Sequence, residues 1–184
     1  GIDYLIHVEI PPYETKDSRI ITDVIEIIQD EYIFDSILIL ATDFGRMIAP
    51  RLAMRLEVGL VADITDVVVD DQGRKLIRPA YSGNMLASIV CDSSPIMASI
   101  HSNVFHFDKD DNTPKLIDFN IENLKSSTIK VISESDNNMD IDIWDVDVLI
   151  ADGGGCRNDW SALYPLSKKL NEAIAVSKQL VDQN

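Results

Sequence analysis

The sequence predicts a three-layer α/β fold, built on a mainly parallel sheet with added antiparallel strands. A helical pattern over 17–32 is followed by a short, unbroken apolar run at 36–41, which is typical of a strand buried on both faces. A second helical pattern follows this run directly, and a second apolar run lies at 146–151. This alternation of helix and buried strand is the pattern of α/β proteins.

The first helix is predicted from the spacing of its apolar residues. These residues are Ile20, Ile21, Val24, Ile27, Ile28 and Tyr32. They repeat at helical intervals, and Asp17 or Ser18 can cap the first turn. Because strand 36–41 is apolar on both faces, we expect it to lie at the centre of its sheet. In the helix after it, Pro50 fits best in the first turn.

The middle of the sequence is predicted to contribute antiparallel strands between residues 67 and 105. Short strands are expected at 60–62, 67–69, 75–78, 85–91 and 96–100. A turn at 71–73 separates two of them. The polar, proline-containing turn at 92–95 is expected to join the last two as a strand pair.

The last third of the sequence indicates a linker and the beginning of another domain. A strand is expected at 130–133, followed by a polar stretch. After strand 146–151 comes a helix, and then a further strand that begins at 173. The apolar positions of that helix are Trp160, Leu163, Leu166 and Leu170. The predicted division is a first domain at 1–133, a linker at 134–145 and a partial domain at 146–184.

Composition restricts the function classes. The formal net charge of −15 repels phosphate backbones and argues against a nucleic-acid partner. Neither a membrane span nor a signal peptide is expected. The two cysteines and three histidines show no metal-ligand spacing, so no metal site is predicted, and a reducing, cytoplasmic location is expected. No nucleophile or acid–base set is visible, which leaves catalysis uncertain and favours a carrier.

A glycine turn is the clearest candidate site. Gly153, Gly154 and Gly155 follow a buried strand and precede a helix, which is where a dinucleotide phosphate binds. A tight turn between a strand and a helix also needs glycine, so the structural interpretation stays open. Asp152 is a poor neighbour for a pyrophosphate because both are anionic.

Several arginines could hold an anion or serve the fold. Arg46 and Arg51 flank a predicted helix start, where unpaired amides favour a phosphate. They could equally satisfy loop carbonyls or carboxylates, and the structural role is the favoured interpretation. The same interpretation applies to Arg78.

Six segments in sequence order resemble the electron-transfer flavoprotein alpha subunit. Residues 45–53 read Gly-Arg-Met-Ile-Ala-Pro-Arg-Leu-Ala and resemble the family's G-R-x-x-A-P-R-L-A. The further segments are 59–63 (Gly-Leu-Val-Ala-Asp), 78–84 (Arg-Pro-Ala-Tyr-Ser-Gly-Asn), 95–100 (Pro-Ile-Met-Ala-Ser-Ile), 148–154 (Val-Leu-Ile-Ala-Asp-Gly-Gly) and 177–182 (Ser-Lys-Gln-Leu-Val-Asp). A single segment is weak, but this order over most of the chain is specific.

The resemblance implies a Rossmann-like, adenine-nucleotide-hydrolase-like domain followed by the beginning of a second nucleotide-binding domain. It implies FAD as cofactor, with Gly153, Gly154, Gly155, Ser177 and Lys178 as cofactor-binding residues. Lys178 stands where the family has arginine, and it keeps the positive charge but not the planar fork. The implied partners are a beta-subunit-like chain and acyl-CoA or other dehydrogenases.

Three hypotheses follow. The first is an alpha-subunit-like part of a heterodimeric, FAD-dependent electron carrier between dehydrogenases and an acceptor. The second is a related scaffold or interaction domain without flavin. The third is a small-nucleotide-binding domain with phosphate near Arg46 or the glycine turn. Since few flavin-contacting elements are recognised, we expect this chain alone to be colourless and to bind FAD only weakly.

Overall fold

The computed structural model describes residues 2–71, 73–102, 104–106, 112–134, 146–153, 163–170 and 173–177. The chain divides into two compact units, Gly1–Ile132 and Ser133–Asn184, and each is described by itself. The finer division into domains at 1–133 and 146–184 with a linker at 134–145 stays a prediction.

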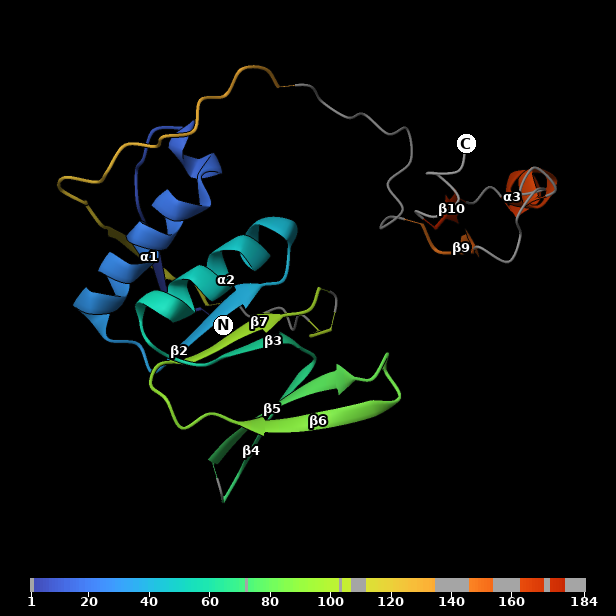
Figure 1. Ribbon diagram of the computed structural model, residues 1–184, viewed down its shortest axis with the longest axis horizontal. Helices are drawn as coiled ribbons and strands as arrows, with labels where there is room; N and C mark the ends of the chain where they lie inside the picture. Colours follow the sequence, from blue (N-terminus) through green and yellow to red (C-terminus); the bar gives the residue numbers. More distant parts are fainter. Residues whose placement is uncertain are drawn as a thin grey trace. The chain divides into compact units, whose positions relative to one another are not determined.

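The first unit is built on a parallel sheet of β2 (Ser36–Leu40), β7 (Ile96–Ile100) and β3 (Leu60–Ile64), in the order β2-β7-β3. The helices α1 (Ser18–Tyr32) and α2 (Asp43–Arg55) lie together over one face of this sheet (Figure 1). Leu52 and Ala53 of α2 and Met97 of β7 form the buried cluster between these layers. The predicted mixed α/β fold is therefore confirmed.

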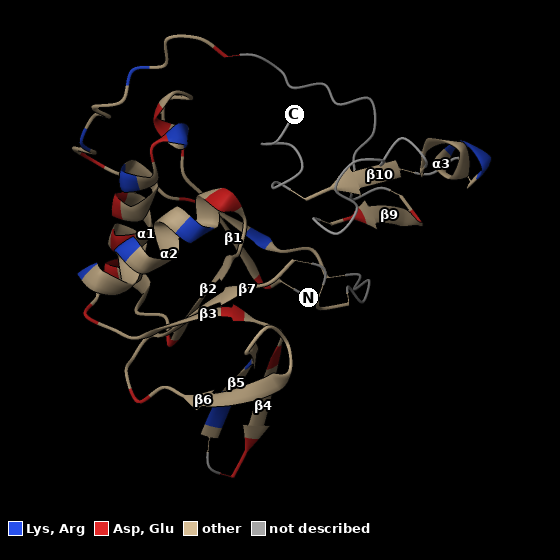
Figure 2. Cartoon of the chain, turned by 45° about the vertical axis from the view of Figure 1, so that its right-hand side comes forward, with Lys and Arg blue, Asp and Glu red and all other residues tan. Residues whose placement is uncertain are grey.

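A second sheet covers the other face of β7 and β3. It consists of β4 (Asp66–Asp70), β5 (Gly73–Ala80) and β6 (Met85–Val90), paired antiparallel in that order. Leu76 of β5 packs with Val61, Ile64 and Ala98 in a second buried cluster. Figure 2 shows charged residues on α1, α2, β4 and β5, whereas β2, β6 and β7 carry none.

Two expectations about strand pairing were wrong. The strand at 85–91 pairs with β5, and β7 is not its partner but lies between β2 and β3. The reason is burial, because Met97, Ala98 and Ser99 are all buried, which requires a strand covered on both faces. Strand β2 is also not central, since among the described residues it ends its sheet. Leu38 and Leu40 on it are 51% and 62% exposed, beyond the edge of the covering antiparallel sheet.

Both helices begin at side-chain caps. Asp17 caps α1, and its Oδ1 accepts a hydrogen bond from the Arg19 amide at 2.9 Å. Thr42 caps α2 through its Oγ1, which accepts from the Gly45 amide at 3.0 Å. Because Thr42 starts the helix, Pro50 lies inside α2 and not in its first turn, contrary to the prediction.

The remaining strands form two parallel pairs. In the first unit, β1 (Tyr4–His7) pairs with β8 (Lys115–Asp118). In the second unit, β9 (Leu149–Asp152) pairs with β10 (Ala173–Val176), and α3 (Tyr164–Leu170) lies between them in sequence. Residues 130–133 are not a strand, so that prediction was wrong.

Gly45 brings α2 close to β2 and cannot carry a side chain. A Cβ atom there would lie 1.9 Å from the Leu40 carbonyl oxygen, which is backbone and cannot rotate away. We predict that Gly45→Ala lowers the free energy of unfolding by at least about 2 kcal/mol in urea denaturation. Gly59→Ala is the matched control, since the nearest atom to its Cβ is 3.9 Å away. Equal stability of the two variants would contradict this packing.

The cap of α1 predicts a pH-dependent stability. Asp17 is 3% exposed, and its pKa is lowered mainly by the hydrogen bond that Ser127 Oγ donates to Oδ2 at 2.6 Å. A lowered folded-state pKa stabilises the protein above the ordinary carboxyl pKa of 3.8, and this contribution is lost as the pH falls through the folded value.

We therefore predict that Ser127→Ala destabilises the protein by about 1 kcal/mol or more at pH 7, and by less below pH 3.8. Part of the effect is independent of pH, because Ser127 Oγ also accepts from the Ile129 amide at 3.0 Å. Unfolding by denaturant at both pH values measures the difference. Ser126→Ala is the control, because Ser126 binds Arg19 through its backbone carbonyl, which the substitution keeps. A loss that is the same at both pH values would refute the charged cap.

Candidate functional site

At the carboxyl ends of β9 and β10, two polar side chains each have a buried oxygen without a hydrogen-bond partner among the described residues. Asp152 ends β9 and is 5% exposed, and Ser177 directly follows β10. The Ser177 amide donates to the Asp152 carbonyl at 2.9 Å, so the backbones are joined. Asp152 Oδ2 and Ser177 Oγ are both buried, and within the described part of the chain neither has a hydrogen-bond partner. Leaving a buried polar group unpaired costs about 1–3 kcal/mol, so a site of this kind favours a ligand.

Gly153 comes next in the chain, and neither packing nor backbone conformation requires glycine there. No atom of the residues that the structure describes lies within 4 Å of a Cβ built on it, and its φ is not in the left-handed region. The need for glycine in a tight turn does not account for this position. A ligand that approaches the backbone at the strand end would account for the glycine, because glycine has no side chain in the way.

These residues would fit part of the flavin nucleotide that the sequence resemblance implies. A carboxylate accepts hydrogen bonds but does not donate them, so it suits the hydroxyl groups of a ribityl chain or a ribose. It does not suit the pyrophosphate, which is also anionic. Of the predicted cofactor-binding residues, Gly153 and Ser177 lie together at this strand end, while Gly154, Gly155 and Lys178 lie outside the described residues.

Asp152 was not among the predicted site residues. The sequence marked it only as a poor neighbour for a phosphate. Its position as the last residue of β9 was the available signal, because ligands of open α/β sheets bind at such ends. The strand itself is not buried, contrary to the prediction for 146–151, since Leu149 and Ala151 are exposed.

The carboxyl ends of the strands in the first unit are occupied by protein groups. Arg46 donates from Nε to the Ala41 carbonyl at 3.1 Å and from Nη1 to Asp63 Oδ2 at 2.9 Å. Asp63 has a left-handed φ of 57°, and its amide donates to Ser99 Oγ at 2.8 Å. Arg46 therefore satisfies a loop carbonyl and a carboxylate, which is the structural role favoured for it.

The other arginines of the recognisable segments show no convergence on a ligand. Arg51 is exposed on α2, and Arg78 Nε donates to the adjacent Pro79 carbonyl at 3.4 Å. Within the described ranges, no group of three or more His, Cys, Asp or Glu residues could hold a metal ion. None of the described helices is long and apolar enough to span a membrane.

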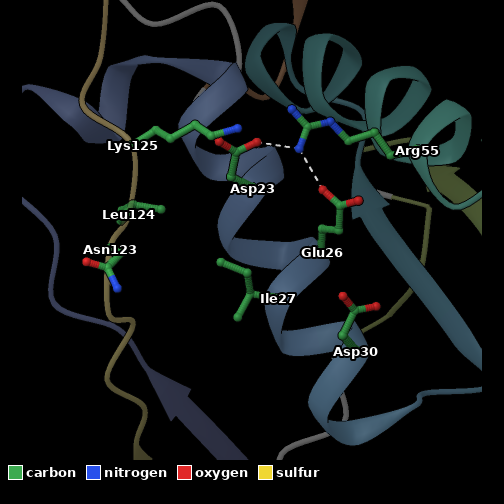
Figure 3. Close-up of a pocket in the computed structure, with 8 residues that line it drawn as sticks. All are labelled: Asp23, Glu26, Ile27, Asp30, Arg55, Asn123, Leu124 and Lys125. Carbon is green, nitrogen blue, oxygen red and sulfur yellow. Dashed lines mark hydrogen bonds and ion pairs between the residues drawn. The ribbon is translucent and has the colours of Figure 1, made fainter.

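A pocket of about 210 Å³ lies beside α1 and is lined by residues of α1, Arg55 of α2 and residues 123–125 (Figure 3). Arg55 Nη1 bridges Asp23 and Glu26, and the Glu26 contact is 2.6 Å long. The hydrogen bonds that Arg55 donates to Glu26 and Asp23 raise the pKa of Arg55 despite its partial burial. Because Arg55 of α2 binds two carboxylates of α1 in this pocket, we assign the pocket to the attachment of α1 to α2.

Comparison with known proteins finds a family model and several relatives that agree with one another. The family model for the electron transfer flavoprotein domain matches residues 1–137. Electron transfer flavoprotein subunit alpha of Clostridium acetobutylicum is 32% identical over 180 residues, which cover 90% of this chain and 52% of the relative.

Two further relatives agree with this match. The subunit alpha of Thermoanaerobacterium thermosaccharolyticum is 30% identical and covers 99% of this chain and 58% of its own length. The lactate dehydrogenase (NAD(+),ferredoxin) subunit LctC of Acetobacterium woodii is 29% identical, with coverages of 95% and 41%. The chain thus spans about half the length of these curated relatives.

The interaction between Ser99 and Asp63 supplies a test of the first unit. Ser99 is 3% exposed, and removing its hydroxyl takes away the acceptor of the Asp63 amide. We predict that Ser99→Ala lowers the free energy of unfolding by about 1–3 kcal/mol in urea denaturation. Ser88→Ala, at an exposed position of β6, should change it by less than about 0.5 kcal/mol. A neutral Ser99→Ala would show that Asp63 does not depend on this hydroxyl.

Proposed function

The chain belongs to the electron transfer flavoprotein domain family, and on that premise we propose that it is an alpha-subunit-like part of a flavin-based electron carrier. The complete assembly would carry electrons through FAD between dehydrogenases and an acceptor. The names of the relatives support this proposal, because they describe an electron transfer subunit alpha and a subunit of an NAD- and ferredoxin-linked dehydrogenase. We place the carrier in the cytoplasm.

The single structural observation that carries the proposal is the buried, unpartnered pair at the ends of β9 and β10. In the proposal, Gly153, Gly154, Gly155 and Ser177 approach the nucleotide part of FAD. Lys178 supplies a positive charge near the ring, where it attracts electron density added to the flavin. FAD itself supplies the electron-transfer chemistry when bound, so the chain has to bind, orient and shield it.

A protein partner is proposed for the antiparallel sheet of the first unit. Its last strand, β6, has one unpaired edge, carries no charged residue, and exposes Met85, Leu86 and Val90 by 54–70%. An uncharged, apolar edge strand is a typical site for another chain to add to. The occupant that we propose is a beta-subunit-like chain, because relatives of this chain are named as subunits. Acyl-CoA or other dehydrogenases would be the electron donors.

The alternative is a scaffold or interaction domain without flavin. One observation favours it for the first unit, since Arg46 at the start of α2 binds the Ala41 carbonyl and the Asp63 carboxylate. This observation also weighs against the hypothesis of a small nucleotide bound near Arg46. It does not bear on the second unit, where the unpartnered pair lies.

The visible absorption spectrum of the assembly separates these functions. The chain and a beta-subunit-like chain from the same genome would be produced together, supplied with FAD, and freed of unbound flavin by gel filtration. The proposal predicts a flavin spectrum in the complex and a colourless protein when the chain is purified alone. Lys178→Ala should reduce the bound flavin or shift its reduction potential. A colourless complex would favour the scaffold.

If the partner binds at the exposed edge of β6, a charge placed on this strand should weaken its binding. We expect Leu86→Asp to weaken binding of the beta-subunit-like chain at least about tenfold, because it introduces a charge into an apolar contact. Met54→Asp is the matched control, since Met54 is 78% exposed but lies on α2, away from this sheet. Analytical ultracentrifugation of the mixtures measures both. Equal effects of the two variants, or none from Leu86→Asp, would place the interface elsewhere.

A further inference from the structure

We propose that Asp152 and Ser177 form a hydroxyl-binding pair, which receives the hydroxyl-bearing chain of the flavin nucleotide at the end of β9. This inference rests on the proposed function and goes beyond it. It assigns a role to Asp152, and it places the ribityl or ribose hydroxyls at this strand end where a glycine turn alone would suggest the pyrophosphate.

The two side chains occupy adjacent places at one edge of the pair of strands. In the parallel register, Val176 lies opposite Asp152, and Ser177 is the next residue. The Ser177 amide binds the Asp152 carbonyl, so the backbone of this edge is already satisfied. What is left over is Oδ2 of the carboxylate and Oγ of the serine, both buried and both without a partner among the described residues.

The chemistry of these two oxygens selects the kind of ligand group. An ionised carboxylate only accepts hydrogen bonds, whereas a serine hydroxyl both donates and accepts. A sugar hydroxyl complements both, because it can donate to Asp152 and accept from Ser177. An acidic residue near the end of a strand binds ribose hydroxyls in the same way in dinucleotide-binding folds. A phosphate would instead be repelled by the Asp152 carboxylate.

The surroundings leave room for such a group. Gly153 follows Asp152 directly, and no atom of the described ranges lies within 4 Å of where its Cβ would be. A ribityl or ribose hydroxyl could therefore reach the strand end. Both groups offer the same neighbouring hydroxyls, so the experiment must distinguish the flavin side of the nucleotide from the adenosine side.

The test is a titration of the ¹⁵N-labelled 184-residue chain, followed by NMR at the amides of Gly153 and Ser177. NMR detects weak binding, which suits a chain expected to bind FAD only weakly. The probes are riboflavin, which has the ring and the ribityl chain, lumiflavin, which has the ring without that chain, and adenosine, which has only the ribose. We expect riboflavin to shift both amides and lumiflavin to bind at least about tenfold more weakly.

Variants connect the binding to the carboxylate. Asp152→Asn keeps the shape but removes the charge, and it should weaken riboflavin binding about tenfold. Asp147→Asn is the matched control, because Asp147 is an exposed carboxylate just before β9. Unchanged amide signals elsewhere would verify that each variant is folded. If adenosine shifts the two amides and riboflavin does not, the pair holds a hydroxyl of the ribose, which supports the hydroxyl-binding assignment and moves it to the adenosine side.

Two results would overturn the inference. If lumiflavin binds as tightly as riboflavin, or if Asp152→Asn binds riboflavin as the unmodified chain does, the hydroxyl pair is refuted while the electron-carrier proposal stands. If none of the three probes moves the amides of Gly153 and Ser177, the hydroxyl pair is refuted, while the electron-carrier proposal is decided separately by the flavin spectrum of the complex.

Discussion

The first unit depends on the burial of β7 from both sides. Met97 packs toward α2, and Ala98, the next residue, packs toward the antiparallel sheet, and both are 0% exposed. Neighbouring residues of a strand point to opposite faces, so one strand joins the two buried clusters. Its two edges pair with β2 and β3. The helices, the parallel sheet and the antiparallel sheet are therefore layers arranged around one strand.

The same strand determines what the ends of the sheet can do. Ser99 continues β7 and binds the Asp63 amide, while Arg46 neutralises the Asp63 carboxylate. The groups at this end of the sheet are thus used by the protein itself. At the ends of β9 and β10, by contrast, Asp152 and Ser177 keep buried oxygens that have no partner in the part of the chain that the structure describes. Because of this difference, we propose that the second unit contacts the flavin and that the first unit has a structural role.

The sequence predicted features that are set by local interactions and missed those set by neighbours in space. Helix α1 was predicted with its Asp17 cap, because apolar spacing and capping are both local. The pairing of β7 was not, since a short turn after β6 resembles a hairpin. Strand β2 was expected at the centre because it is apolar on both faces. The residues that cover those faces come from elsewhere in the chain, so the sequence of the strand alone does not identify them. Asp152 was overlooked for the same reason, because the missing partner of a side chain is visible only in the folded chain.

The most direct test of the account is hydrogen–deuterium exchange of the assembled complex with and without FAD, which measures where the flavin protects backbone amides. The account predicts added protection at 149–153 and 173–177, and none at the start of α2, residues 41–46. Protection at 41–46 without protection at the ends of β9 and β10 would contradict this assignment, because the flavin would then lie on the first unit.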